Sequence, residues 1–233
     1  MDVKFVIVGV LLLVVIIGGF IFMNSGVLYS SSEETEECER IVYNGNPVEQ
    51  INVVFLAKGI GKGKINDYID SLLSFEVFSK SKDQFNFFYV EEEVECEMQY
   101  SAILCYSKDL IKKSASCPND FVVVLKDEKR SVRSSAYMNV ISLNSNLPVS
   151  VFAHEFAHVF ANLADEYVPA KIPRGAENCQ KSCEDFSVGE GCFEGCSESD
   201  FFRSSESSIM RTLSSNSFYE LNENIIKEEL ESY

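Results

Sequence analysis

The pattern of hydrophobic and polar positions divides the chain into three parts. Residues 5–23 form an unbroken apolar run, FVIVGVLLLVVIIGGFIFM, which as a helix would span roughly 28 Å, close to the hydrocarbon thickness of a bilayer. A cleavable signal peptide is the alternative, but its apolar stretch is usually about 7–15 residues long and ends at a small-residue cleavage site. We therefore predict an uncleaved single-pass transmembrane helix at 5–23, an acidic Ser- and Glu-rich stalk at 24–47 and a folded domain at 48–233.

The charges around the apolar run and the positions of the cysteines predict the same orientation. Lys4 and the chain amine precede the run, whereas glutamates cluster after it between Glu33 and Glu39. Positive charge is enriched on the cytoplasmic side of membrane spans, so residues 1–4 are expected to be a short cytoplasmic end and the domain extracytoplasmic. All eight cysteines follow the run, and disulfides are stable outside the cytosol. The alternative is a cytoplasmic domain whose thiols are all reduced.

Hydrophobic periodicity in the rest of the chain predicts a mixture of strands and helices. Short β-branched or aromatic runs predict strands at 51–57, 85–94, 121–125 and 139–143. Apolar residues at helical spacing predict helices at 65–75 and 147–163, the second with Pro148 near its start, and a closing amphipathic helix at 222–233. Strands and helices do not alternate as regular β-α-β units, so the expected class is α+β with a mixed sheet.

The charge balance argues against one class of partner. Asp and Glu outnumber Lys and Arg by 36 to 20, which gives a formal net charge of −16. Such a surface repels phosphate backbones, so we expect no nucleic-acid partner. The share of hydrophobic residues, 46%, is typical of a globular domain and argues against a wholly disordered chain.

The only two histidines lie in one pentapeptide, His154-Glu155-Phe156-Ala157-His158. On a helix, positions i and i+4 are one turn apart on the same side, so the two imidazoles can bind one metal ion. Glu155 can then reach a water on that ion without being a ligand. This is the H-E-x-x-H arrangement of zinc-dependent amide hydrolysis, in which zinc polarises the carbonyl and lowers the pKa of the water while Glu takes the proton. The alternative is two packed or exposed histidines without a metal.

The third ligand of such a zinc must be a carboxylate or a thiolate, because the chain has no third histidine. Asp165 has nearly the same helical angle as His154, but a continuous helix would place it about 16 Å further along the axis. The helix must therefore stop and turn back, and Asn162 suits that turn because Asn tolerates left-handed backbone angles. We predict Asp165 as the third ligand, with Glu166 as the second choice. Alternatively, the two acids only cap the turn.

The segment HEFAHVFANLADEY, residues 154–167, resembles the H-E-x-x-H…L-A-D-E-Y signature of the zinc metallopeptidases typified by bacterial immunoglobulin A peptidases. Residues 75–90 are similar to the helix-to-strand segment upstream of that signature, and residues 207–210 resemble the Met-turn of metzincin-like enzymes. The resemblance covers roughly residues 51–233.

This resemblance implies a zincin-like metallopeptidase domain with an active-site helix. It implies His154 and His158 as zinc ligands, Glu155 as general base and Met210 as a hydrophobic base under the site. The chain departs from the metzincin pattern at Ala161 and Ala164, where that pattern has Gly and a third His. Activity on immunoglobulin is not implied, because the signature does not describe the surfaces that select a substrate.

A cysteine-rich segment, 179–196, follows the acidic pair. Its two C-x-x-x-C pairs predict nested disulfides, Cys179 with Cys196 and Cys183 with Cys192, while a four-thiolate zinc site is the alternative. The remaining cysteines could pair as Cys105 with Cys117 and Cys38 with Cys96, although eight cysteines allow 105 pairings.

Together these features predict a membrane-anchored, outward-facing zinc endopeptidase that acts on a peptide or protein. A strand near Ser134 to Leu143 could hold an extended substrate by edge pairing. Two other functions stay open: a catalytically silent binding module with a zincin fold, and a zinc hydrolase of a non-peptide amide such as a cell-wall linkage.

Overall fold

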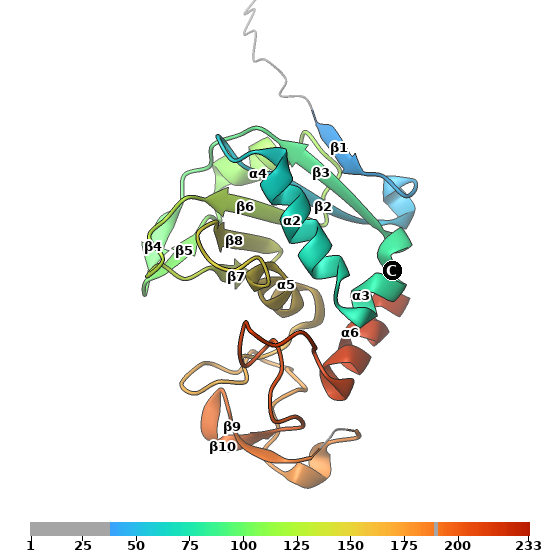
Figure 1. The fold of residues 1–233 in the computed structure, drawn as a ribbon, viewed down its shortest axis with the longest axis vertical. Coiled ribbons are helices and arrows are strands. Elements are labelled where there is room, and N and C mark those ends of the chain that lie inside the picture. Colours follow the sequence, from blue (N-terminus) through green and yellow to red (C-terminus); the bar gives the residue numbers. More distant parts are fainter. Residues whose placement is uncertain (1–37, 189–190) are drawn as a thin grey trace, which may run out of the picture. The chain divides into compact units, whose positions relative to one another are not determined.

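A mixed sheet of six strands organises residues 38–188 and 191–233, which the computed structural model describes (Figure 1). The strand order is β1-β3-β2-β6-β8-β7, in which the inner four strands are parallel and both edge strands run antiparallel to their neighbours. The strands of this sheet are β1 (Glu39–Val42), β2 (Ile51–Leu56), β3 (Phe85–Val90), β6 (Phe121–Lys126), β7 (Ser135–Tyr137) and β8 (Val140–Asn144). The architecture is therefore α+β with a mixed sheet.

Helices and two small hairpins complete the described chain. The α-helices are α2 (Lys62–Leu73), α3 (Glu76–Lys80), α4 (Lys108–Ser114), α5 (Val151–Ala161) and α6 (Glu220–Ser232). The hairpins are β4 (Glu97–Gln99) with β5 (Ala102–Leu104), and β9 (Phe193–Cys196) with β10 (Glu198–Arg203). Short 3-10 turns cover Pro47–Glu49, Lys82–Gln84 and Cys183–Asp185.

Both faces of the sheet are covered, because successive side chains of its central strands point to opposite sides. Val53 and Phe55 of β2 belong to the larger core, which α2, α3, α5 and α6 cover, whereas Val54 and Leu56 belong to a smaller core with Leu110 of α4. The central strands are therefore apolar on both faces, which explains why β2 and β3 have no exposed residue.

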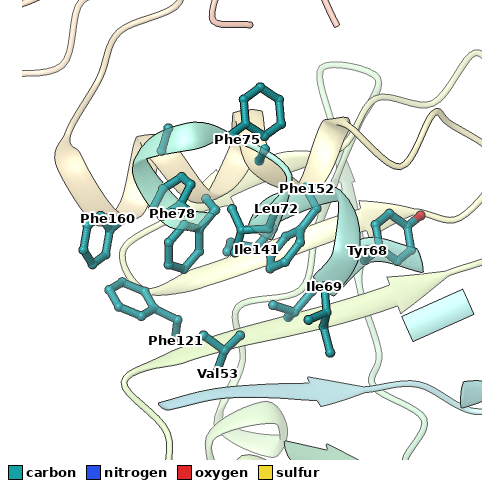
Figure 2. Close-up of a cluster of buried hydrophobic side chains, with 14 of the residues drawn as sticks. Val53, Tyr68, Ile69, Leu72, Phe75, Phe78, Phe121, Ile141, Phe152 and Phe160 are labelled. Carbon is teal, nitrogen blue, oxygen red and sulfur yellow. The ribbon is translucent and has the colours of Figure 1, made fainter. Parts of the chain in front are cut away.

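Aromatic side chains fill the larger core (Figure 2). Phe152 of α5 contacts Phe55 of β2, with ring centroids 5.4 Å apart, and Phe156 lies 5.2 Å from Phe121 of β6. Tyr68 of α2 meets Phe152 edge-on. Since edge-to-face pairs contribute about 0.5–1.5 kcal/mol beyond the area they bury, this cluster holds α5 firmly against the sheet.

Most of the expected elements are present, with shifted ends. The expected strand at 85–94 ends at Val90, and the expected helix at 147–163 begins only at Val151. Pro148 precedes that helix, and its carbonyl accepts a hydrogen bond from the Val151 amide in a turn. The single strand expected near Ser134 to Leu143 is a hairpin of the edge strand β7 and the inner strand β8.

The expected fold class is wrong in placing a transmembrane helix before this domain. The apolar run at 5–23 lies outside the described residues, and within 38–188 and 191–233 no helix is long and apolar enough to cross a bilayer. The most apolar helix, α5, has only 11 residues, or roughly 16 Å of the roughly 30 Å that a span requires. Part of the expected stalk at 24–47 is described, and there Glu39–Val42 forms β1 and pairs with β3.

All eight cysteines form disulfides. The nested pairs Cys179–Cys196 and Cys183–Cys192 are confirmed. The other two suggested pairings are wrong, because the bonds are Cys38–Cys117 and Cys96–Cys105. Cys96 and Cys105 flank the β4–β5 hairpin, whose antiparallel pairing brings them together, and this leaves Cys38 beside β1 to bond Cys117.

Candidate metal centre

The two histidines lie on the side of α5 that faces away from the sheet. Phe152, Phe156 and Phe160 recur every four residues and pack into the larger core. His154 and His158 follow this aromatic stripe at an offset of two positions, which is about 200° around a helix. Packing of the phenylalanines therefore determines where the imidazoles point.

His154, His158 and Asp165 form a cluster able to hold one metal ion, with their ligand atoms all within 4.8 Å of one another. The Nε2 atoms of His154 and His158 are 3.2 Å apart. Oδ1 of Asp165 lies 3.1 Å from Nε2 of His154 and 3.3 Å from Nε2 of His158. The structure thus brings together the three residues that the sequence suggested as ligands.

Backbone carbonyls orient both rings. Nδ1 of His154 lies 2.9 Å from the Ile209 carbonyl oxygen, and Nδ1 of His158 lies 2.6 Å from that of Leu163. A carbonyl only accepts hydrogen bonds, so each Nδ1 carries a proton and donates it. In the neutral rings Nε2 then carries a free lone pair that can bind a metal. Histidines that bind a metal through one ring nitrogen usually donate a hydrogen bond from the other, as Nδ1 does here.

Three lone-pair atoms therefore face one another around one point. Only a cation or added protons can offset the repulsion between them. Oδ1 of Asp165 is buried and accepts no hydrogen bond from the described residues. Without a metal, burial lowers the pKa of His158, but the Asp165 and Glu155 carboxylates and the Leu163 carbonyl outweigh burial and raise it to about 9. Burial acts to raise the pKa of Asp165, and the two imidazoles outweigh it and hold that pKa well below its usual range. These donors suit zinc, which binds imidazole and carboxylate.

Glu155 borders the same site without belonging to the ligand cluster. It is only 7% exposed, and it lines a cleft of about 500 Å³ together with His154, His158 and Asp165. Burial raises the pKa of Glu155, although the neighbouring histidines oppose that shift. A carboxylate with a raised pKa is better matched to proton transfer near neutral pH.

The reversal of the chain after α5 occurs at Asn162, as the sequence suggested. Asn162 has φ 51° and ψ 31°, a left-handed conformation, and the Leu163 amide donates back to the Ala157 carbonyl. The Asp165 backbone is then held by the residue that directly follows the cysteine-rich segment, because Ser197 Oγ donates to its carbonyl oxygen over 2.6 Å. The disulfides of that segment therefore support the loop that carries the candidate third ligand.

Glu166, the second choice for third ligand, points away from the cluster. Its carboxylate is fully buried and accepts hydrogen bonds from Ser208 Oγ, Asn222 Nδ2 and Asn178 Nδ2. These donors come from three places: the residue directly before the cysteine-rich segment, the residue before the turn at Met210, and α6. Glu166 thus joins elements distant in sequence and has no free oxygen to offer a metal.

Met210, the residue expected to lie beneath the metal site as its hydrophobic support, is completely buried in the larger core. Its carbonyl accepts a hydrogen bond from the Glu166 amide over 2.9 Å, and the preceding carbonyl, of Ile209, orients His154. The turn around Met210 therefore contacts both the histidine helix and the acidic loop.

Two residues at the site escaped the sequence reasoning. Tyr167 and Arg133 both line the cleft beside Glu155. Burial, followed by the nearby Asp165 carboxylate, raises the pKa of Tyr167, so its phenol stays protonated and able to donate. Adjacency to Asp165 in sequence could have suggested Tyr167, whereas nothing in the sequence around Arg133 marks it.

No protein-family model matches the chain, and no curated protein does.

Proposed function

We propose that this protein is a zinc-dependent endopeptidase of the kind that its sequence signature resembles. The observation that carries the proposal is the convergence of His154, His158 and Asp165 beside the buried carboxylate of Glu155. When bound there, zinc would supply Lewis acidity, which polarises a carbonyl and lowers the pKa of a nearby water. The resemblance to immunoglobulin A peptidases favours peptide bonds as substrate.

Glu155 would act as the general base and then as the general acid. Its raised pKa and its position beside His154 suit it to take a proton from the attacking water and return it to the leaving amine. Tyr167, protonated and lining the same cleft, can donate a hydrogen bond to the substrate carbonyl as negative charge develops on it.

An extended peptide would lie along β7. Ser135–Tyr137 is the edge strand of the sheet, and residues 134–138 line the cleft with the two histidines. β5 pairs with the chain at Arg133, and Ser135 Oγ at the start of β7 donates to the Ile103 carbonyl of β5. In the described part of the sheet the backbone of β7 is paired only with β8, so the proposed peptide would bind beyond Ser135. Main-chain hydrogen bonds to such an edge orient a peptide without requiring a particular sequence.

The proposed place of action is an oxidising, extracytoplasmic compartment. Four disulfides link the described chain, and such bonds rarely persist in a reducing cytosol. One of them, Cys179–Cys196, closes the segment directly before Ser197, which holds the Asp165 backbone.

Glu155→Gln is the most direct test of this function. The full chain, loaded with zinc, is assayed on casein and on a mixed peptide library, and its zinc content is measured alongside. Because Glu155 moves protons but does not bind the metal, the variant should lose about 10²–10⁴-fold in kcat/KM and keep its zinc. A matched control is Glu49→Gln, an exposed acid outside the cleft, which should keep full activity.

The other outcomes separate the remaining functions. Zinc binding without cleavage of any peptide would favour a silent binding module, and turnover confined to glycan-linked peptides would favour a hydrolase of cell-wall amides. Full activity of Glu155→Gln would contradict the role proposed for Glu155.

A further inference from the structure

A second cavity, of about 240 Å³, opens beside the candidate metal centre, and we call it the arginine pocket. It shares His154 and Glu155 with the main cleft. Apolar side chains, among them Leu147, Val151 and Leu213, form part of its lining. Two guanidinium groups, those of Arg133 and Arg211, also line it.

Backbone carbonyls hold both arginines. Arg133 donates from Nη2 to the Tyr100 carbonyl, and Arg211 donates from Nη1 to the Glu166 carbonyl, each over 3.2 Å. Across residues 38–188 and 191–233 neither guanidinium forms an ion pair with a carboxylate. The other arginines among these residues also lack a carboxylate partner, so what distinguishes Arg133 and Arg211 is that both line one cavity.

The chemistry of the pocket fits a carboxylate on a short apolar stem. A guanidinium has five N–H donors in a fixed fork that matches a carboxylate, and a carbonyl contact leaves most of them free. The apolar walls can cover the methylene groups that carry the acid. Glu155 is the one acidic residue among the described residues that line the cavity, and it lies on the side shared with the main cleft.

We propose that the arginine pocket recognises a carboxylate on the substrate, next to the bond that is cleaved. This proposal rests on the proposed peptidase function and adds the substrate class. Because the pocket adjoins Glu155 and His154, a group that enters it belongs to a residue adjacent to the scissile bond. The carboxylate is either an Asp or Glu side chain or the free C-terminus of a peptide.

Matched peptides test the proposal on the full zinc-loaded chain. Once library cleavage has located the bond, peptides with Glu or Gln on either side of it are compared, each as a free acid and as a C-terminal amide. Charged hydrogen bonds contribute about 1.5–3 kcal/mol, so the preferred acid should raise kcat/KM about 10–100-fold over its neutral counterpart. A preference for Glu in amidated peptides identifies a side-chain carboxylate as the group that enters the pocket. A preference for free acids alone identifies the C-terminal carboxylate as that group.

Variants locate the preference in the pocket. Arg211→Gln and Arg133→Gln should each reduce the preference for the acid to within about threefold. Arg211 does not line the main cleft, so Arg211→Gln should do this with little change for the neutral peptide. Both side chains are largely exposed, so neither variant should disturb the fold, and an unchanged Tm checks this. Arg130→Gln, an exposed arginine that lines neither cavity, should keep the preference.

A binding measurement separates failure of this proposal from failure of the peptidase function. Fluorescence anisotropy with labelled Glu and Gln peptides on zinc-loaded Glu155→Gln does not need turnover. Tighter binding of the acid that is lost in the added Arg211→Gln variant supports the pocket even if no peptide is cleaved. Equal binding of acid and neutral peptides, or a preference that survives both arginine variants, would overturn the proposal.

Discussion

His158 is the residue at which a proton and the proposed zinc ion would compete. Its Nδ1 is committed to the Leu163 carbonyl, so Nε2 alone is available, and it lies 3.3 Å from the Asp165 carboxylate. The pKa of His158, raised to about 9, means that the metal-free site keeps a proton there at neutral pH. Zinc needs the same lone pair and must displace that proton.

Opposite pH trends of stability should follow with and without zinc. A folded-state pKa of about 9, above the ordinary value of about 6.5, stabilises the metal-free protein fully below pH 6.5, and this contribution is lost as the pH rises towards 9. The gain in Tm on adding zinc should instead grow over the same window, because fewer protons remain to be displaced. Thermal unfolding of the full chain in EDTA and in excess zinc, from pH 6 to 9, measures both trends. A zinc-induced gain that is constant across this range would contradict the assignment.

At the scale of elements, the buried carboxylate of Glu166 connects three segments around the site. Asn178 directly precedes the cysteine-rich segment, Ser208 precedes the turn at Met210 and Asn222 lies on α6. Ala164 directly precedes the candidate ligand, and Asn178 binds its backbone on both sides. Asn178 Oδ1 accepts a hydrogen bond from the Ala164 amide over 2.8 Å, and Asn178 Nδ2 donates one to the Ala164 carbonyl over 2.9 Å. The position of Asp165 therefore depends on contacts between elements that are distant in sequence.

Replacing Glu166 should expose that dependence. Glu166→Ala leaves several buried donors without a partner and should lower the free energy of unfolding by about 3–5 kcal/mol. Glu166→Gln keeps a carbonyl oxygen for the two asparagines and should cost about 1.5 kcal/mol or less. Urea unfolding of both variants provides the comparison, and zinc affinity should fall more in the alanine variant. Equal costs for the two changes would show that the network does not act as described.

At the scale of the whole molecule, the sequence predicted what depends on local spacing. Strands such as β2 and β6, the histidine pair on one side of a helix and the turn at Asn162 all follow from residues close together in the chain. The role of Glu166 and the presence of Arg133 at the cleft depend on how distant segments pack, which one sequence does not reveal.

The cysteines show the same limit. The nested bonds of 179–196 could be predicted because their partners are near in sequence. Cys38 and Cys117 are 79 residues apart, and only the folded sheet brings them together. The expected membrane helix shows a different limit, because an apolar run of sufficient length indicates a span without establishing one.

Zinc stoichiometry by mass spectrometry of the full chain tests the central claim, that His154, His158 and Asp165 hold one divalent cation. After zinc loading and removal of excess metal at pH 8, the unmodified chain should hold one zinc ion. Asp165→Ala and His158→Ala should each retain less than about a tenth of that amount, while Glu155→Gln retains all of it. A chain that binds no zinc, or an Asp165→Ala variant that still binds one ion, would contradict the account.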